Sequence, residues 1–166
     1  MSIIEISTTL EKTQRMRTVK DILDTKTKPF NQVSPSTLVI EALNLLNSVN
    51  LSYLVVMDAD EYKGIFSERD YTRNVILRGR ASNTTQVRDA MTTDLPIVTL
   101  IDTVEHCMNL MNSHKTRYLL AYDDMHFEGV ITIHDLLRQA ITNRHEVFDD
   151  SLAEKLLDED ESGRIY

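Results

Sequence analysis

The chain has 166 residues, of which 42% are hydrophobic and 27% are charged, and its formal net charge is −8 at pH 7. This composition is ordinary for a globular domain, and a nearly balanced acidic chain lacks the excess of Lys and Arg that non-specific nucleic-acid binding needs. The single cysteine, Cys107, excludes an internal disulfide, and no apolar run is long enough to span a membrane. We therefore expect a cytoplasmic protein that binds neither nucleic acid nor membrane.

Residues 1–17 show no hydrophobic period and are expected to form a lead-in. Residues 18–78 then form a first unit, whose apolar periods alternate between the spacing of helices and that of strands. Its expected elements are, in order, a helical turn (19–23), a short strand near Val33, a helix from Val39 capped by Ser36 or Thr37, two strands (53–57 and 62–66) joined by a turn, and a helix (67–77).

Residues 79–86 are mostly small and polar and are expected to be a linker. Residues 87–142 repeat the order of the first unit, with a helical turn at 87–91, a strand near Val98, a helix after Asp102 or Thr103, a strand pair, and a helix from Thr132 to about Thr142. Residues 143–166 hold three basic and eight acidic side chains. They are expected to form a short amphipathic helix and an acidic tail.

The two units share more than their order of elements. Residues 33–76 align with residues 98–141 at a constant offset of 65, and 13 of these 44 pairs are identical, where chance would give roughly three. A three-stranded sheet with helices on one face leaves its other face apolar, so the two units should pack together. The duplication thus predicts a pseudo-symmetric pair with two equivalent clefts.

One polar motif is kept in both copies, at residues 64–70 and 129–135. Each copy reads glycine, two apolar residues, a hydroxyl residue, two variable residues and aspartate. Helix capping alone would explain the hydroxyl and the acid. The alternative is a ligand site, because a helix start with a hydroxyl suits phosphate, an aspartate one turn later suits a ribose diol, and glycine lets backbone or ligand approach closely. Such a pair of groups is typical of nucleotide binding.

The repeat order and the duplicated motif resemble a pair of cystathionine-beta-synthase-type (CBS) domains, the Bateman module, over residues 18–141. The resemblance implies an α+β fold of two β-α-β-β-α repeats packed sheet to sheet. It also implies that adenosine-containing ligands bind in clefts between the repeats, AMP first among them, with ADP, ATP or S-adenosylmethionine as alternatives. Members of the family commonly form homodimers and regulate other proteins without catalysing a reaction.

The family's site residues transfer to seven positions of this chain. The aspartates are implied to hold ribose, the hydroxyls to lie beside ribose or phosphate, and the residues before each aspartate, with one arginine from the second copy, to face the phosphates: Asp70, Asp135, Ser67, Thr132, Arg69, His134 and Arg117. The chain departs from the family at Leu54 and Leu119, where proline is frequent. We hypothesise that the Asp70 cleft, with Arg69 and Arg117, binds phosphates more tightly at neutral pH, and that the Asp135 cleft strengthens when His134 is protonated.

The sequence therefore favours a non-catalytic module that senses energy or cofactor state for an unknown regulated partner. The alternative is a dimeric interaction scaffold whose clefts are vacant or structurally occupied. The five histidines show no paired metal-ligand spacing, and no nucleophile–base set or phosphate loop is visible. We therefore expect no metal and no enzymatic activity.

Overall fold

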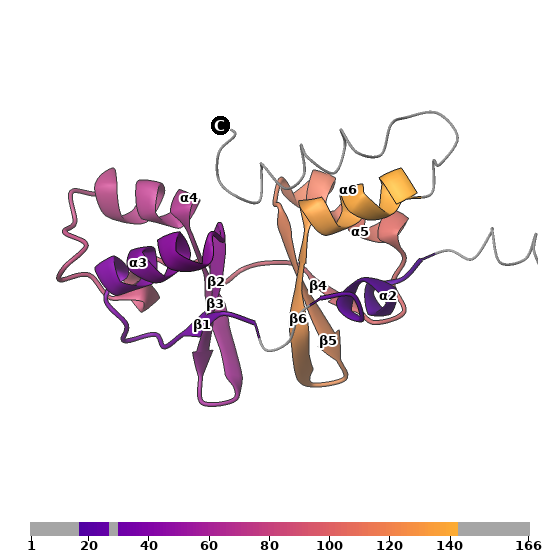
Figure 1. Cartoon of the computed structure of the whole chain (residues 1–166), viewed down its shortest axis with the longest axis horizontal. Helices are drawn as coiled ribbons and strands as arrows, with labels where there is room; N and C mark the ends of the chain where they lie inside the picture. The colour runs from indigo at the N-terminus through magenta and orange to yellow at the C-terminus, as the bar shows by residue number, and fades with distance from the viewer. Residues whose placement is uncertain (1–16, 27–29, 143–166) are drawn as a thin grey trace, which may run out of the picture.

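The computed structural model describes residues 17–26 and 30–142. It contains two three-stranded sheets that lie side by side, each with its own helices on the outer face (Figure 1). The expected α+β fold of two equivalent repeats is confirmed. Residues 1–16 of the predicted lead-in and the acidic tail at 143–166 lie outside the described residues, and the domain boundaries stay a prediction.

The elements follow the predicted order in both halves. The first half contains α2 (Val19–Leu23), β1 (Gln32–Val33), α3 (Val39–Val49), β2 (Tyr53–Asp58), β3 (Glu61–Ser67), α4 (Glu68–Asp70) and the π-helix η1 (Tyr71–Ile76). The second half contains the 3₁₀ turn η2 (Val87–Asp89), β4 (Ile97–Thr99), α5 (Val104–His114), β5 (Tyr118–Asp123), β6 (His126–Thr132) and α6 (Ile133–Thr142). The last helix differs between the halves, since α4 continues as a π-helix and α6 is α-helical throughout.

The two sheets have the same topology. Strand β1 pairs with β2 in parallel and β2 pairs with β3 antiparallel, and β4, β5 and β6 repeat this arrangement. In β2, Leu54 and Val56 face the helices while Val55 faces the other sheet. Because both faces of the sheet are covered, the strand is a continuous apolar run.

One expectation about helix capping is wrong. The N-cap of helix α3 is Leu38, whose side chain makes no capping hydrogen bond. The Glu41 carboxylate instead accepts a hydrogen bond from the Leu38 amide at 3.1 Å. Thr37 precedes the N-cap, and its hydroxyl accepts from the Ser34 amide at 3.2 Å. In the second half Thr103 caps α5, as expected, through the His106 amide at 3.1 Å.

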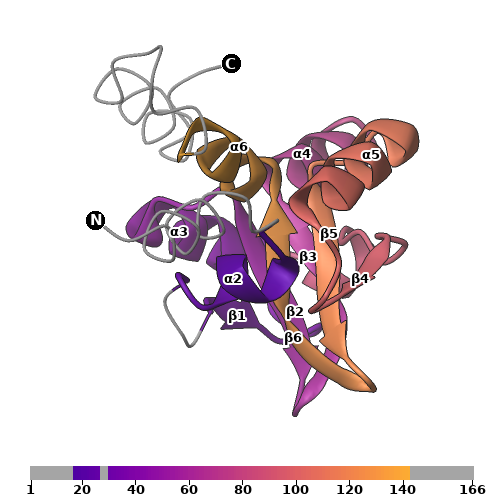
Figure 2. The same cartoon turned by 90° about the vertical axis from the view of Figure 1, so that its right-hand side faces the viewer.

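The opening turns of the two repeats are exchanged in space. Helix α2 comes first in the chain, yet it lies beside β6 of the second repeat (Figure 1, Figure 2). The Val19 amide donates to the Asp102 carbonyl at 2.9 Å, and Val19 and Ile22 are buried in the same core as Cys107. Turn η2 does the reverse, because Val87 is buried in the core of the first repeat. Each repeat is therefore completed by the segment that precedes the other.

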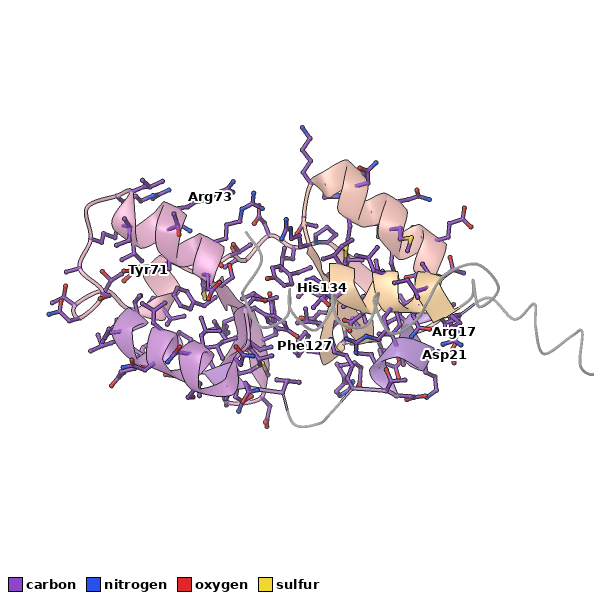
Figure 3. All side chains as sticks on the ribbon, turned by 45° about the horizontal axis from the view of Figure 1, so that its top comes forward. Arg17, Asp21, Tyr71, Arg73, Phe127 and His134 are labelled. Atoms are coloured by element: carbon purple, nitrogen blue, oxygen red, sulfur yellow. The ribbon has the colours of Figure 1, made fainter. Side chains whose placement is uncertain are left out.

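The inner faces of the sheets form a third apolar cluster between the repeats. Every member has its counterpart, 65 positions along the chain, in the same cluster: Phe30 and Leu95, Tyr53 and Tyr118, Val55 and Leu120, Met57 and Tyr122, Tyr62 and Phe127, Ile65 and Val130. Figure 3 shows Phe127 between the two sheets. The interface is thus built from one set of positions used twice.

Candidate functional site

A cleft of about 1140 Å³ opens between the two repeats, next to this apolar interface. It is lined by the starts of α4 and α6 and by the residues that lead into β2 and β5. All seven residues that the sequence analysis proposed line this one cleft: Ser67, Arg69, Asp70, Arg117, Thr132, His134 and Asp135. The two expected clefts are continuous, so ligands in the two halves would share one space.

In the first half, Asp70 is a buried carboxylate that receives three hydrogen bonds. Its Oδ2 accepts from the Ser67 amide at 2.8 Å and from the Ser67 hydroxyl at 2.6 Å. The first of these bonds, with the Asp70 amide donating to the Ser67 hydroxyl at 3.2 Å, forms a capping box at the start of α4. Its Oδ1 accepts from the Thr92 hydroxyl at 2.6 Å. Capping is therefore part of the role of Asp70, and both carboxylate oxygens are engaged within the protein.

In the second half, Asp135 has a different set of partners. Its Oδ2 accepts from the Thr132 amide at 2.7 Å and from the Lys26 ammonium at 2.7 Å. None of these contacts goes to Oδ1. The side chains of Lys26 and Asp135 are 26% and 14% exposed, so the ion pair is partly buried. Lys26 also donates to the Val130 carbonyl at 2.8 Å.

The two motif glycines allow the opening turns to approach the sheets. A Cβ on Gly64 would lie 2.8 Å from the Thr92 carbonyl oxygen, and one on Gly129 would lie 3.1 Å from a methyl group of Leu23. Of the two explanations for these glycines, close approach of backbone or of ligand, the structure supports the first.

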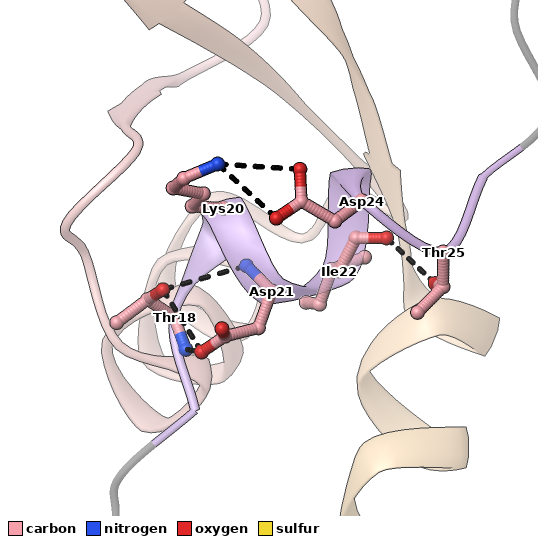
Figure 4. A network of polar contacts seen from close by, with 6 residues as sticks. All are labelled: Thr18, Lys20, Asp21, Ile22, Asp24 and Thr25. Atoms are coloured by element: carbon pink, nitrogen blue, oxygen red, sulfur yellow. Dashed lines mark hydrogen bonds and ion pairs between the residues drawn. The ribbon is translucent and has the colours of Figure 1, made fainter.

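Helix α2 positions Lys26. Its first turn is closed by a capping box in which the Thr18 amide donates to Asp21 at 2.9 Å, and the Thr25 hydroxyl donates to the Ile22 carbonyl at 2.7 Å (Figure 4). Burial of Ile22 fixes this turn against the second repeat. Lys26 follows the end of α2 by three residues and reaches Asp135 at 2.7 Å.

Positive charge gathers in the cleft of an acidic chain. The lining has six Lys and Arg residues against four Asp and Glu, with two histidines: Lys26, Arg69, Arg73, Lys115, Arg117 and Arg138; Glu68, Asp70, Asp94 and Asp135; His114 and His134. In Figure 3, His134 lies at the end of α6 nearest the first repeat, and Arg73 is on the helix of that repeat. A cleft of this charge attracts anions.

Part of the cleft lining is aromatic. Tyr53 and Tyr118 line the cleft, and their ring centroids lie 5.2 Å apart. Burial raises the pKa of Tyr118, and a hydrogen bond with the Ser52 side chain opposes that rise. The phenol is thus neutral at physiological pH and offers a flat, uncharged surface.

Four lining residues that bear on the chemistry were not among the seven. Arg73 and Arg138 follow the two aspartates by three positions and form one identical pair of the repeat alignment, so both lie one helical turn beyond the predicted site residues. Thr92 and Lys26 gave no such signal. In the alignment of the opening turns at an offset of 68, Thr92 matches Asp24 and Lys26 matches Asp94.

Within the described ranges, no group of three or more His, Cys, Asp and Glu side chains comes together as the ligands of a metal ion would. None of the helices in that part of the chain is long and apolar enough to cross a membrane.

Comparison with known proteins agrees with this architecture. The family model of the CBS domain matches residues 19–76 and again residues 87–141, which together are more than half of the chain. The chain belongs to the CBS-domain family. It is a CBS pair, which is a regulatory module.

Other CBS proteins resemble it along most of its length. CBSX3, a mitochondrial CBS domain-containing protein of Arabidopsis thaliana, is 28% identical over an alignment of 138 residues that covers 78% of this chain and 67% of that protein. A protein with CBS domains from Burkholderia ambifaria MC40-6 has a solved structure with a TM-score of 0.73 and 32% identity, covering 80% of this chain and 98% of its own. The structure of CBSX2 in complex with AMP has a TM-score of 0.64 and 29% identity, and the match covers 76% of this chain and 98% of the CBSX2 chain.

Proposed function

We propose that this CBS pair binds an adenosine-containing ligand, AMP first and ADP, ATP or S-adenosylmethionine as alternatives, in the cleft between its repeats. It would thereby report energy or cofactor state to a partner protein without catalysing a reaction. The observation that carries the proposal is the cleft itself, which combines paired aspartates, positive charge and aromatic surface in one space. The AMP complex of CBSX2 supports the choice of ligand.

Each part of a nucleotide has a chemically suited surface in the cleft. Tyr53, Tyr118 and Phe30 offer faces against which adenine could stack. Asp135 offers a carboxylate oxygen to a ribose hydroxyl, and Arg69 and Arg117 offer guanidinium groups to phosphate. Ligand pockets usually measure roughly 300–1,000 Å³, so the cleft of about 1140 Å³ has room for one nucleotide or for two.

Thermal unfolding with AMP, ADP, ATP, S-adenosylmethionine and NAD tests the proposal. A ligand that binds only the folded protein stabilises it by about 2.7 kcal/mol at a concentration of 100 Kd, and we expect AMP to raise the Tm. Asp135→Asn should reduce the rise, and Asp123→Asn, at an exposed position outside the cleft, should not. No rise with any of the five ligands would contradict the proposal.

A ligand-free interaction scaffold is the second candidate, and the contacts of Asp70 favour it. Both oxygens of that carboxylate are satisfied within the protein, by Ser67 and Thr92. Native mass spectrometry of the purified protein separates the two candidates, because it reports bound nucleotide and the expected homodimer together. A ligand-free dimer whose Tm responds to no nucleotide would favour the scaffold.

A further inference from the structure

The two aspartates of the cleft are held by different chemistry at equivalent places. In the first half, the Thr92 amide donates to the Ile65 carbonyl at 2.8 Å and the Thr92 hydroxyl donates to Asp70 at 2.6 Å. In the second half, the single ammonium of Lys26 donates to the corresponding carbonyl, that of Val130, at 2.8 Å and to the aspartate, Asp135, at 2.7 Å, where it binds Oδ2 and not Oδ1. Ile65 and Val130 are counterparts in the repeat.

The two arrangements differ in how firmly they are held. Thr92 and Ile65 form a two-way backbone bridge, because the Ile65 amide also donates to the Thr92 carbonyl at 2.9 Å. The donor in the second half is a side chain on a flexible four-carbon stem. Asp24, which matches Thr92 in the sequence, faces Lys20 at the surface, with its carboxylate 3.1 Å from that ammonium.

A ribose diol would find different carboxylate oxygens occupied at Asp70 and at Asp135. At Asp70 it would compete with Ser67 and with a hydroxyl fixed by the backbone bridge. At Asp135, one ribose hydroxyl can use Oδ1, and the second competes with Lys26 for Oδ2. Lys26 can move away by rotating its side chain, with no change in the backbone.

The ammonium stays within the cleft when it moves off Asp135, where a second anion can bind it. Moving a charge away from its carboxylate in a partly buried site is unfavourable unless a second negative charge replaces it. The phosphate of a nucleotide provides that charge, and neutral adenosine does not. Lys26 would therefore weaken the binding of adenosine and strengthen the binding of a nucleotide.

We infer that the Asp135 half is the site for phosphorylated ligands and that Lys26 is the residue that selects them over the neutral nucleoside. This inference rests on the proposed function, since it concerns the ligand of the same cleft. It reverses the order of the two halves that was expected at neutral pH from Arg69 and Arg117. A charge-assisted hydrogen bond supports a preference of about tenfold or more.

Isothermal titration of the full chain with AMP and with adenosine tests the role of Lys26. In Lys26→Met we expect AMP to bind about tenfold more weakly while adenosine binds as well as before or better, so the preference for AMP falls. Thr92→Val, which removes the equivalent donor in the first half, is the matched control and should keep the wild-type preference. Lys26→Arg keeps the charge and should retain most of the preference.

The outcomes are distinguishable. If the wild-type protein binds neither ligand, the proposed function fails and this inference fails with it. If the wild-type protein prefers AMP and Lys26→Met keeps the same preference, the inference fails while the proposed function stands. If Lys26→Met and Lys26→Arg lose the preference equally, charge is not what selects the ligand, and the inference is again wrong.

Discussion

The carbonyl oxygen of Thr92 lies 2.8 Å from the point where a Cβ on residue 64 would stand, so Gly64 and Thr92 can be neighbours only while residue 64 has no side chain. The contact is a backbone one, since the Ile65 amide donates to the same oxygen at 2.9 Å. Backbone atoms cannot rotate away as a side chain can. The motif glycine is therefore required by the exchange of the opening turns.

Gly64→Ala should lower the free energy of unfolding by about 1–3 kcal/mol, the usual effect of inserting an atom into a close-packed region. Urea unfolding followed by circular dichroism measures the change. Gly79→Asn is the control, because no atom lies within 4 Å of a Cβ there and asparagine tolerates the positive φ of 65°. An effect of Gly64→Ala no larger than that of the control would contradict the close contact.

Val19→Ala should destabilise the second repeat, although residue 19 precedes the first. Val19 is fully buried among side chains of α5 and β5, and removing two methyl groups there should cost about 2 kcal/mol. Hydrogen exchange should show amides of α5 and β5 losing protection before those of α3 and β2. Val87→Ala is the matched variant and should give the opposite order, since Val87 lies in the first core.

The two capping hydroxyls should differ in their contribution to stability. The Ser67 hydroxyl accepts from the Asp70 amide at 3.2 Å and also donates to the Asp70 carboxylate at 2.6 Å. The Thr132 hydroxyl accepts from the Asp135 amide at 3.2 Å. Loss of an N-cap costs about 0.5–2 kcal/mol, so Ser67→Ala should lie near the upper end and Thr132→Val, which replaces only the hydroxyl, near the lower end. Equal effects in urea unfolding would show that the second bond contributes nothing.

Stability should fall above pH 9. Burial, with a smaller effect of Asp102, raises the pKa of the Cys107 thiol from its ordinary value of 9.0 to about 11. Below pH 9 the thiol is protonated in both states; between about pH 9 and 11 the unfolded chain releases the proton and the folded chain keeps it, which favours unfolding. Wild-type protein should therefore lose more stability between pH 8 and 10.5 than Cys107→Ala. Parallel losses in the two proteins would contradict a raised pKa.

The features that both repeats preserve, namely the order of elements and the motif that ends in aspartate, were predictable from the sequence. Asp70 and Asp135 both line the cleft because each lies three residues after the hydroxyl residue that ends an equivalent strand. This position depends only on the local sequence. The exchange of α2 and η2 was missed because contacts distant in sequence leave no periodic pattern in the chain. Lys26 was missed for a related reason, since the loop after α2 is three residues longer than its counterpart and shifts the alignment.

The π-helix at Tyr71–Ile76 shows a different limit of the sequence pattern. The apolar spacing predicts a helix, and the segment is one, with the Leu77 amide donating to the Thr72 carbonyl five residues earlier at 3.0 Å. Within this segment the Asn74 side-chain amide makes a tertiary contact, because it donates to the Ala90 carbonyl at 2.8 Å. The apolar period of a six-residue segment does not distinguish a π-helix from an α-helix.

The paired interface between the sheets has an evolutionary consequence. A single repeat with this inner face would bind a second copy of itself, since its residues share one cluster with their counterparts, and Tyr53 packs on Tyr118 as Tyr62 packs on Phe127. In such a dimer the two ligand positions would have to be identical. Fusion of two copies into one chain removes that constraint, and a lysine can then arise beside one aspartate while a threonine remains beside the other.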